Sequence, residues 1–342
     1  MGEKGKDLAM KTLVTVWKQD LREVLFPEEV CRQLEAVSSV DWVPLGQPYE
    51  GQQLEREIHR YDAVITSWGS PKITSSVLAQ AGRLRFIGHA AGTLTPYLDP
   101  SVFERELVIV NANSALARST AEFAVTLMLT GSWRVCSYWD SLRDGRWNKN
   151  NSGTVPGLYG QSIGIVGLGE VSREVIRLLR GFNPHIRLYS PYCTREEAQE
   201  LGVTLCSLEE VLRNSQVVSL HDTLTAATRG MLGREQLRLL PDGALLVNTA
   251  RGPIIEEAAL LDELASGRIY AALDVYDIEP LPADHPLPKL PNVMCFPHIG
   301  AYSEYWKSQQ GAMIVEDLSR FVAGQPLLRQ ITAERFQRMT LN

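Results

Sequence analysis

The stretch Gly164-Ile165-Val166-Gly167-Leu168-Gly169-Glu170-Val171-Ser172 decides the fold of this chain. An apolar run ends here in closely spaced glycines, and a helical pattern follows. In this interpretation Val166 closes a buried strand, Gly167 permits a tight turn, and Gly169 lets the backbone approach a pyrophosphate at the N-terminus of the helix. Ser172 stands where the dinucleotide-binding motif GxGxxG has its last glycine, so an ordinary strand-turn-helix remains the alternative for this stretch alone.

Short β-rich runs alternate with helical segments after this loop. We predict strands in six of these runs, at residues 186–189, 203–205, 217–220, 244–248, 270–274 and 293–296. Between them, Ser207 and Glu210 have the spacing of a capping box, and Gly202 marks the end of a helix. Alternation of this kind indicates right-handed crossovers and an α/β fold with a doubly wound parallel sheet.

Residues able to do chemistry follow the predicted strands. The glycine loop, His221, Arg251, Glu279 and His298 all follow strands. Because the carboxyl ends of parallel strands meet at the same edge of a sheet, we expect these residues along one rim, where open α/β sheets bind ligands.

Three residues of this rim suit the reduction of a 2-keto acid. The guanidinium of Arg251 matches a carboxylate with two parallel hydrogen bonds. His298 can give up or take a proton near neutral pH. Glu279 can orient that imidazole and favour its charged form. With a nicotinamide as hydride donor, Arg251 would hold the substrate and His298 would protonate the developing alkoxide.

The motifs around these residues resemble the D-isomer-specific 2-hydroxyacid dehydrogenase family, to which glyoxylate/hydroxypyruvate reductases and phosphoglycerate dehydrogenases belong. The resemblance covers roughly residues 60 to 325 and rests on the glycine loop, His221 to Thr228, Asn248 to Gly252, Ala272 to Pro280, Asp284 to Leu287, and Pro297 to Gly300. It implies an NAD(P)-dependent oxidoreductase that transfers a hydride between a nicotinamide and a small 2-keto or D-2-hydroxy acid.

The resemblance also implies roles for single residues. Arg251 would bind the substrate, and Glu279 would assist His298 as the acid/base. The backbone of His89, Ala90, Ala91 and Gly92 would meet the substrate carboxylate. The implied cofactor-binding set is Gly167, Leu168, Gly169, Glu170, Val171, Ser190, Arg195, His221, Thr249, Asp274 and His298. Within it Asp274 would hold the nicotinamide carboxamide, while His221 has the alternative of packing beneath the cofactor.

Cofactor choice between NAD and NADP is open at this stage. The second strand of the cofactor domain ends at Ser190, where NAD-preferring members of the family carry an acidic residue for the adenosine ribose. Arg195 follows and has two interpretations, a partner for a 2′-phosphate or a solvated residue of a helix start. We expect measurable use of NADPH. Glu170 must point away from the pyrophosphate, because like charges repel.

The chain is long enough for two domains. We assign residues 117–306 to the dinucleotide-binding Rossmann domain. Residues 1–116, with 307–342 returning to them, form a smaller flavodoxin-like substrate domain, with strands predicted at 12–17, 63–68, 85–87 and 107–111 and an apolar helix at 119–133 after it. In the family the irregular segment 139–159 forms an arm of a homodimer, and the alternative is an ordinary surface loop.

Composition excludes several other classes of protein. The formal net charge of −6, without a cluster of Lys and Arg, argues against a nucleic-acid surface. The five cysteines are odd in number and scattered, which predicts free thiols and no metal site. The first residues are too charged for a secretory signal, and no apolar run is long enough for a membrane span. We therefore expect a soluble cytoplasmic protein.

Two alternatives to a 2-hydroxyacid dehydrogenase remain. Formate or phosphite dehydrogenases share this fold, although Glu279 argues against the first because formate dehydrogenases carry an amide there. A nucleotide-sensing, corepressor-like interaction protein is the second, and intact Arg251, Glu279 and His298 make it less economical. The identity of the 2-hydroxy acid is left open, as is whether Tyr302 and Trp306 line its pocket.

Overall fold

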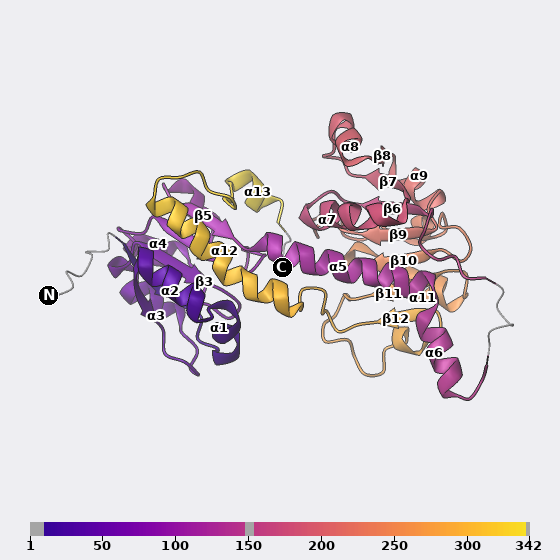
Figure 1. The fold of residues 1–342 in the computed structure, drawn as a ribbon, viewed down its shortest axis with the longest axis horizontal. Coiled ribbons are helices and arrows are strands. Elements are labelled where there is room, and N and C mark those ends of the chain that lie inside the picture. The colour runs from indigo at the N-terminus through magenta and orange to yellow at the C-terminus, as the bar shows by residue number, and fades with distance from the viewer. Residues whose placement is uncertain (1–9, 148–153, 340–342) are drawn as a thin grey trace. The chain divides into compact units, whose positions relative to one another are not determined.

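The computed structural model describes residues 10–147 and 154–339, and the chain divides into two units. The first unit comprises residues 1–116 and 303–342, and the second comprises residues 117–302. Each unit contains one parallel sheet with helices, so the predicted α/β fold class is confirmed (Figure 1). The return to the first unit begins at Ser303 instead of residue 307, because Ser303 is the N-cap residue of α12 (Glu304–Val322) and the whole helix belongs to that unit.

The second unit is built on a seven-stranded sheet in the order β12-β11-β10-β9-β6-β7-β8. Its neighbouring strands are all parallel. The strands are β6 (Ser162–Val166), β7 (His185–Tyr189), β8 (Thr204–Leu205), β9 (Val217–Leu220), β10 (Leu245–Asn248), β11 (Tyr270–Leu273) and β12 (Val293–Cys295). β6 pairs with β7 on one side and with β9 on the other, so the chain order reverses there. Open α/β sheets bind ligands outside the strand ends at such a switch point.

Helices bury both faces of this sheet. Successive strand residues face opposite sides, so that Ile165 and Leu245 belong to one apolar cluster while Val166 and Leu246 belong to another. The helices are α5 (Asn113–Ser132, beginning in the first unit), α6 (Val135–Arg143), α7 (Glu170–Leu179), α8 (Arg195–Leu201), α9 (Leu208–Arg213), α10 (Arg234–Leu237) and α11 (Glu257–Ala265), with 3-10 turns η3 (Arg180–Phe182), η4 (Gly252–Ile254) and η5 (Leu287–Lys289).

Local chemistry explains where these elements begin and end. Ser207 and Glu210 cap each other's backbone at the start of α9, and Gly202 ends α8 in the left-handed region at φ +71°. The predicted capping box and helix stop are therefore confirmed. Two predictions were wrong in their bounds. α5 starts at Asn113 instead of residue 119, and α6 occupies the start of the segment 139–159 that was expected to be irregular. Residues 148–153 of that segment lie outside the described residues.

The first unit has a five-stranded parallel sheet in the order β2-β1-β3-β4-β5. Its strands are β1 (Lys11–Val14), β2 (Ser39–Trp42), β3 (Ala63–Thr66), β4 (Phe86–His89) and β5 (Val108–Asn111). Its helices are α1 (Gln19–Leu25), α2 (Glu28–Val37), α3 (Gly51–Glu57), α4 (Ser75–Gln80), α12 and α13 (Ala333–Gln337), with 3-10 turns η1 (Ile58–Arg60) and η2 (Pro100–Glu104). The edge strand β2 was not predicted, because it is short and only partly buried.

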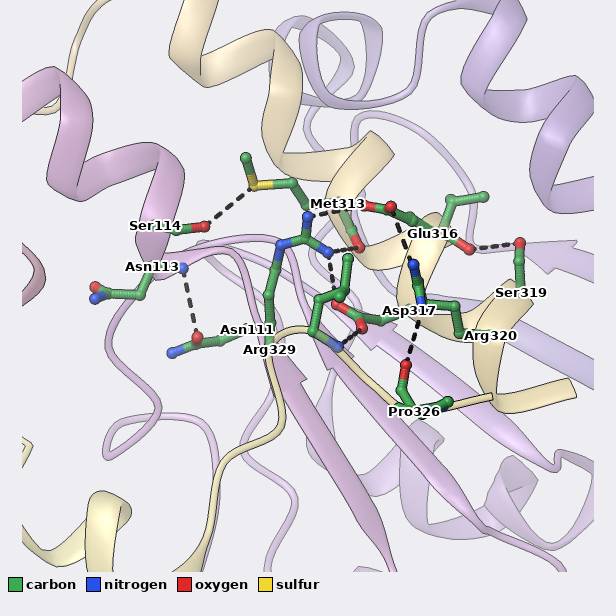
Figure 2. A network of polar contacts seen from close by, with 12 residues as sticks. Asn111, Asn113, Ser114, Met313, Glu316, Asp317, Ser319, Arg320, Pro326 and Arg329 are labelled. Atoms are coloured by element: carbon green, nitrogen blue, oxygen red, sulfur yellow. Dashed lines mark hydrogen bonds and ion pairs between the residues drawn. The ribbon is translucent and has the colours of Figure 1, made fainter. Parts of the chain in front are cut away.

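The segment around Arg329 is fastened to this unit by an ion-pair network with one buried and one exposed carboxylate (Figure 2). Arg329 donates to Asp317 at 2.7 Å and to Glu316 at 2.8 Å, both on α12. Asp317 is fully buried, and its other oxygen accepts from the amide of Leu328 at 2.7 Å. The amide of Ile331 then bonds the carbonyl of Ile109 on β5 at 2.8 Å. The tail therefore covers an edge strand whose polar groups would otherwise be open to another chain.

Candidate active site

A carboxylate-imidazole pair stands at the carboxyl edge of the second sheet. Glu279 follows β11, His298 follows β12, and Nδ1 of His298 lies 2.6 Å from Oε2 of Glu279. The other oxygen, Oε1, accepts from the amide of Tyr276 at 3.0 Å, so both carboxylate oxygens are used. An ionised carboxylate only accepts, which places a proton on Nδ1 and leaves Nε2 for a substrate. Both side chains remain solvent-accessible, with 46% of His298 and 35% of Glu279 exposed.

The backbone of His298 is held in an unusual conformation by Asp274. His298 has φ +56°, in the left-handed region. The two oxygens of the buried Asp274 accept from the amides of Ile299 and Gly300, each at 2.8 Å. Ser119 donates to the carbonyl of Gly300 at 2.8 Å from the other side. Burial raises the pKa of Asp274, while these two amides and the nearby His298 oppose that change. Asp274 therefore fixes the loop that carries the imidazole, a contact that sequence reasoning missed.

Arg251 follows β10 at the same edge. The side chain of Asn248 holds the Arg251 loop through two hydrogen bonds. Its NH2 group donates to the carbonyl of Arg251 at 3.0 Å, and its Oδ1 accepts from the backbone amide of Ala250 at 3.0 Å. Burial lowers the pKa of Arg251, and the charge of Glu279 raises it. A guanidinium stays charged in proteins, so this desolvated cation is suited to an anionic ligand.

Gly252 allows the Arg251 loop to approach the Glu279 loop closely. A Cβ at Gly252 would lie 2.5 Å from the amide nitrogen of Asp277 and closer still to the carbonyl of Tyr276. No larger residue fits without moving one backbone. Asn248 and Gly252 stand in a motif that the sequence singled out, but their roles become visible only once two distant loops are seen together.

The glycine loop has the form that a dinucleotide requires. Gly167 adopts φ +92°, which allows the tight turn, and its amide continues the pairing of β6 with β7 by donating to the carbonyl of Tyr189 at 2.8 Å. A Cβ at Gly169 would meet nothing within 4 Å, so the space above the start of α7 is open. The first amides of a helix lack intrahelical acceptors and suit an anion. Ser172 is fully buried and its hydroxyl accepts from the amide of Gly169 at 2.8 Å, which explains how serine replaces the last glycine.

Two residues that follow the neighbouring strands β9 and β10 at this edge carry orphaned polar atoms. Both ring nitrogens of His221 and the hydroxyl of Thr249 are buried without a hydrogen-bond partner among the described residues. Burial lowers the pKa of His221 to about 3, so its ring is neutral at physiological pH. Buried polar groups without partners are costly, and a bound ligand would satisfy them. Together with the open Gly169 they show that the residues present fit a dinucleotide.

Comparison with known proteins agrees with this geometry. Residues 125–300 match the family model described as "D-isomer specific 2-hydroxyacid dehydrogenase, NAD binding domain". The glyoxylate reductase of Korarchaeum cryptofilum is 33% identical over 304 residues, which are 87% of this chain and 91% of that relative. The chain belongs to the D-isomer specific 2-hydroxyacid dehydrogenase family. The matched family model is that of an NAD binding domain, so a nicotinamide dinucleotide, NAD or NADP, is the cofactor of this family.

Other members of the family differ from this chain in length. The D-3-phosphoglycerate dehydrogenase of Archaeoglobus fulgidus is 33% identical over 277 residues, 81% of this chain and 52% of that protein. The chain thus spans about half the length of the phosphoglycerate dehydrogenases it matches. Among solved structures, a phosphoglycerate oxidoreductase from Rhizobium etli has a TM-score of 0.81 at 25% identity and covers 95% of this chain and 99% of its own.

Two residues predicted for the adenosine end of the cofactor lie after β7. Ser190 is buried, with 7% exposed, and its hydroxyl accepts from the amide of Tyr192 at 3.3 Å. Arg195 is the exposed first residue of α8 and makes no hydrogen bond or ion pair within the described residues. Ser190 therefore serves a turn, and its contact with a cofactor stays a prediction, as does that of Arg195.

The predicted substrate loop lies in the first unit, where its first residue is a core side chain. The imidazole of His89 is fully buried, lies 2.8 Å from the hydroxyl of Thr66 and stacks on Tyr97 at 4.6 Å between centroids. The imidazole of His89 therefore packs in the core, its Nε2 has no hydrogen-bond partner within the described residues, and the role predicted for the backbone of this loop stays a prediction. The amide of Ala90 is bonded to the carbonyl of Thr66 at 2.8 Å. Within the described residues only the amides of Ala91 and Gly92 in this loop have no intramolecular acceptor.

Two aromatic residues after His298, Tyr302 and Tyr305, are exposed. Tyr302 is 69% and Tyr305 63% exposed, and the ring of Tyr305 packs edge-on against Trp306 with centroids 4.9 Å apart. A role for them in substrate selection stays a prediction.

Proposed function

We propose that this chain is an NAD(P)-dependent reductase of small 2-keto acids, and catalyses the reverse oxidation of D-2-hydroxy acids. The observation that carries the proposal is the 2.6 Å contact between His298 and Glu279 on the edge that also carries Arg251 and the glycine loop. A bound nicotinamide would supply or accept the hydride.

The residues of this chain account for the remaining chemistry. Arg251 binds the substrate carboxylate and polarises the keto group with a desolvated positive charge. Nε2 of His298 donates a proton to the keto oxygen as it becomes an alkoxide, and removes it in the reverse direction. Glu279 stabilises the imidazolium that donates the proton during reduction. In both directions of the reaction it holds the ring in the tautomer that is protonated on Nδ1. The amides of Ala91 and Gly92 are proposed as further donors to the carboxylate.

The test is a panel of keto acids with a matched pair of histidine variants. Purified protein is assayed with glyoxylate, hydroxypyruvate, pyruvate and phenylpyruvate, and with formate and phosphite in the oxidising direction, using both nicotinamide cofactors. His298→Ala should lower turnover of the best keto acid by about two to four orders of magnitude while NADH still binds. His59→Ala, at an exposed position of the first unit, is the control and should keep full activity. Turnover of phosphite or formate alone would contradict the proposal, as would a fully active His298→Ala.

We also propose that the chain forms a homodimer through α6. The helix and Trp133, two residues before it, expose apolar side chains, with Trp133 54%, Trp139 64% and Leu142 59% exposed. They line a hollow of about 690 Å³. Clusters of exposed apolar residues of this kind mark protein interfaces. Light scattering should report a dimer for the native protein and a monomer for Trp139→Asp, and a native monomer would contradict the proposal.

We also propose that the chain resides in the cytoplasm. All five cysteines are free thiols, which suits the reducing conditions of the cytoplasm. Among the helices in residues 10–147 and 154–339, none has the length and hydropathy of a membrane span.

A further inference from the structure

Position 190 lacks the acidic residue expected beside the adenosine ribose, but the carboxylate residue Asp222 lies close to Gly167, the first glycine of the phosphate loop. Asp222 follows β9, one residue beyond His221, and is half-buried. A Cβ at Gly167 would lie 2.6 Å from the nitrogen, 2.7 Å from the Cα and 2.8 Å from the Cβ of Asp222. Asp222 therefore packs directly against the first glycine of the phosphate loop.

The sheet order places Asp222 and Ser190 on opposite sides of that glycine. β6 pairs with β7 on one side and with β9 on the other. The amide of Gly167 bonds the carbonyl of Tyr189, next to Ser190, while its Cα faces Asp222. In Rossmann domains the acidic residue that binds the ribose stands at the end of the second strand, beside this first glycine. Asp222, after β9, lies beside the same glycine on its other side.

The carboxylate of Asp222 has capacity to accept from a ligand. Its Oδ1 accepts from the amide of Thr223 at 2.9 Å, and Oδ2 makes no hydrogen bond within the described residues. No Lys or Arg of the described chain pairs with it, and burial raises its pKa. Ser190 offers less, because it is 7% exposed and its hydroxyl already accepts from Tyr192.

We infer that Asp222 takes the place of the missing acid at position 190, accepting hydrogen bonds from the adenosine ribose hydroxyls and selecting NADH over NADPH. A 2′-phosphate would bring two or more negative charges against this carboxylate. The inference reverses the expectation drawn from Ser190 alone. It rests on the proposed function only in that the chain binds a nicotinamide dinucleotide.

Equilibrium titration of the full chain with NADH, NADPH and ADP-ribose tests the inference without turnover. The variant is Asp222→Asn, whose amide oxygen can keep the bond from the Thr223 amide. The control is Asp242→Asn, since Asp242 precedes β10 and lies at the opposite end of the strands. Charge-assisted hydrogen bonds contribute enough that their loss weakens binding by about tenfold or more.

The native protein should bind NADH at least about tenfold more tightly than NADPH, as expected from the loss of one charge-assisted hydrogen bond and added repulsion. Asp222→Asn should weaken NADH and ADP-ribose by about tenfold and leave or improve NADPH, and Asp242→Asn should change neither. Native preference for NADPH, lost on Arg195→Ala, would overturn the inference in favour of a phosphate contact. An equal change for both dinucleotides in Asp222→Asn would overturn it as well, because the carboxylate would then act on the shared pyrophosphate.

The outcomes separate this inference from the proposed function. Asp222-dependent binding without turnover of any keto acid would contradict the proposed function alone. Keto-acid turnover with dinucleotide affinities that Asp222→Asn does not change would contradict the inference alone. A chain that binds no dinucleotide would contradict both.

Discussion

Gly252→Ala should disrupt the active site through one methyl group. The new Cβ would lie 2.5 Å from the amide nitrogen of Asp277 and closer to the carbonyl of Tyr276. Ordinary contacts between such atoms are about 3.5 Å, so the closest approach, to the carbonyl of Tyr276, requires the two loops to separate by more than about 1 Å. Tyr276 donates its amide to Glu279, and Glu279 contacts His298 at 2.6 Å, so the displacement reaches the catalytic pair.

The cost can be measured as stability and as catalysis. Overpacking of a close contact costs about 1–3 kcal/mol, and a misplacement of about 1 Å at a reacting group can cost about a hundredfold in rate. Urea denaturation and kcat/KM for the best keto acid are compared with those of Gly181→Ala, a position where a Cβ meets nothing within 4 Å. Gly181→Ala should match the native protein. If Gly252→Ala also had native stability and native kcat/KM, the close approach would not matter and the reasoning would be refuted.

Three further predictions concern charge and protonation. Glu279→Gln should shift the alkaline limb of the pH profile for reduction to lower pH, because the His298 imidazolium loses its anionic partner; an unchanged profile would argue against the pair. Arg251→Lys keeps the charge but loses the paired geometry, so KM for the keto acid should rise at least about tenfold while the Kd of NADH stays constant, and equal losses would indicate a structural arginine. Burial lowers the pKa of His89 and His221 to about 3, against about 6.5 in the unfolded chain. Below a pH of about 6.5 the unfolded form therefore binds more protons than the folded form. As the pH is lowered through this range, the free energy of unfolding falls by up to about 1.4 kcal/mol per pH unit for each histidine. Urea denaturation at pH 7 and pH 5 measures this loss of stability. His89→Gln should make the difference in the free energy of unfolding between the two pH values smaller, and an equal difference in the native protein and in His89→Gln would contradict the prediction.

Much of the cofactor unit could be predicted from the chain. The six strands proposed after the glycine loop are observed to within one residue at each end. Most of them are short apolar runs bounded by caps and glycines, so local pattern and burial agree, above all for β9, β10 and β11. The first unit was predicted less well, because β2 is a partly buried edge strand without a clear pattern. The extension of α5 to Asn113 was missed because Ala, Leu and Arg favour a helix without an apolar stripe.

The candidate active site likewise has residues that the sequence predicted and contacts that it did not. Arg251, Glu279 and His298 could be found because each follows a parallel strand, and parallel strands carry such residues to one edge whatever their spacing in the chain. His89 could not be recognised as a core group, because its burial depends on Thr66 and Tyr97 from separate segments. The bonds of Asp274 to the loop of His298, and of Ser119 to Gly300, also join distant segments.

The sequence alone thus determined the element order, the fold class and the residues of the rim, since each depends on local periodicity and on the direction of the strands. Only the tertiary structure decided which groups touch. The packing of Asp222 against Gly167 and the approach of Gly252 to Tyr276 are set by strands that pair across the sheet. Such contacts depend on register and backbone spacing, to which residues far apart in the chain contribute together, and no local pattern encodes them.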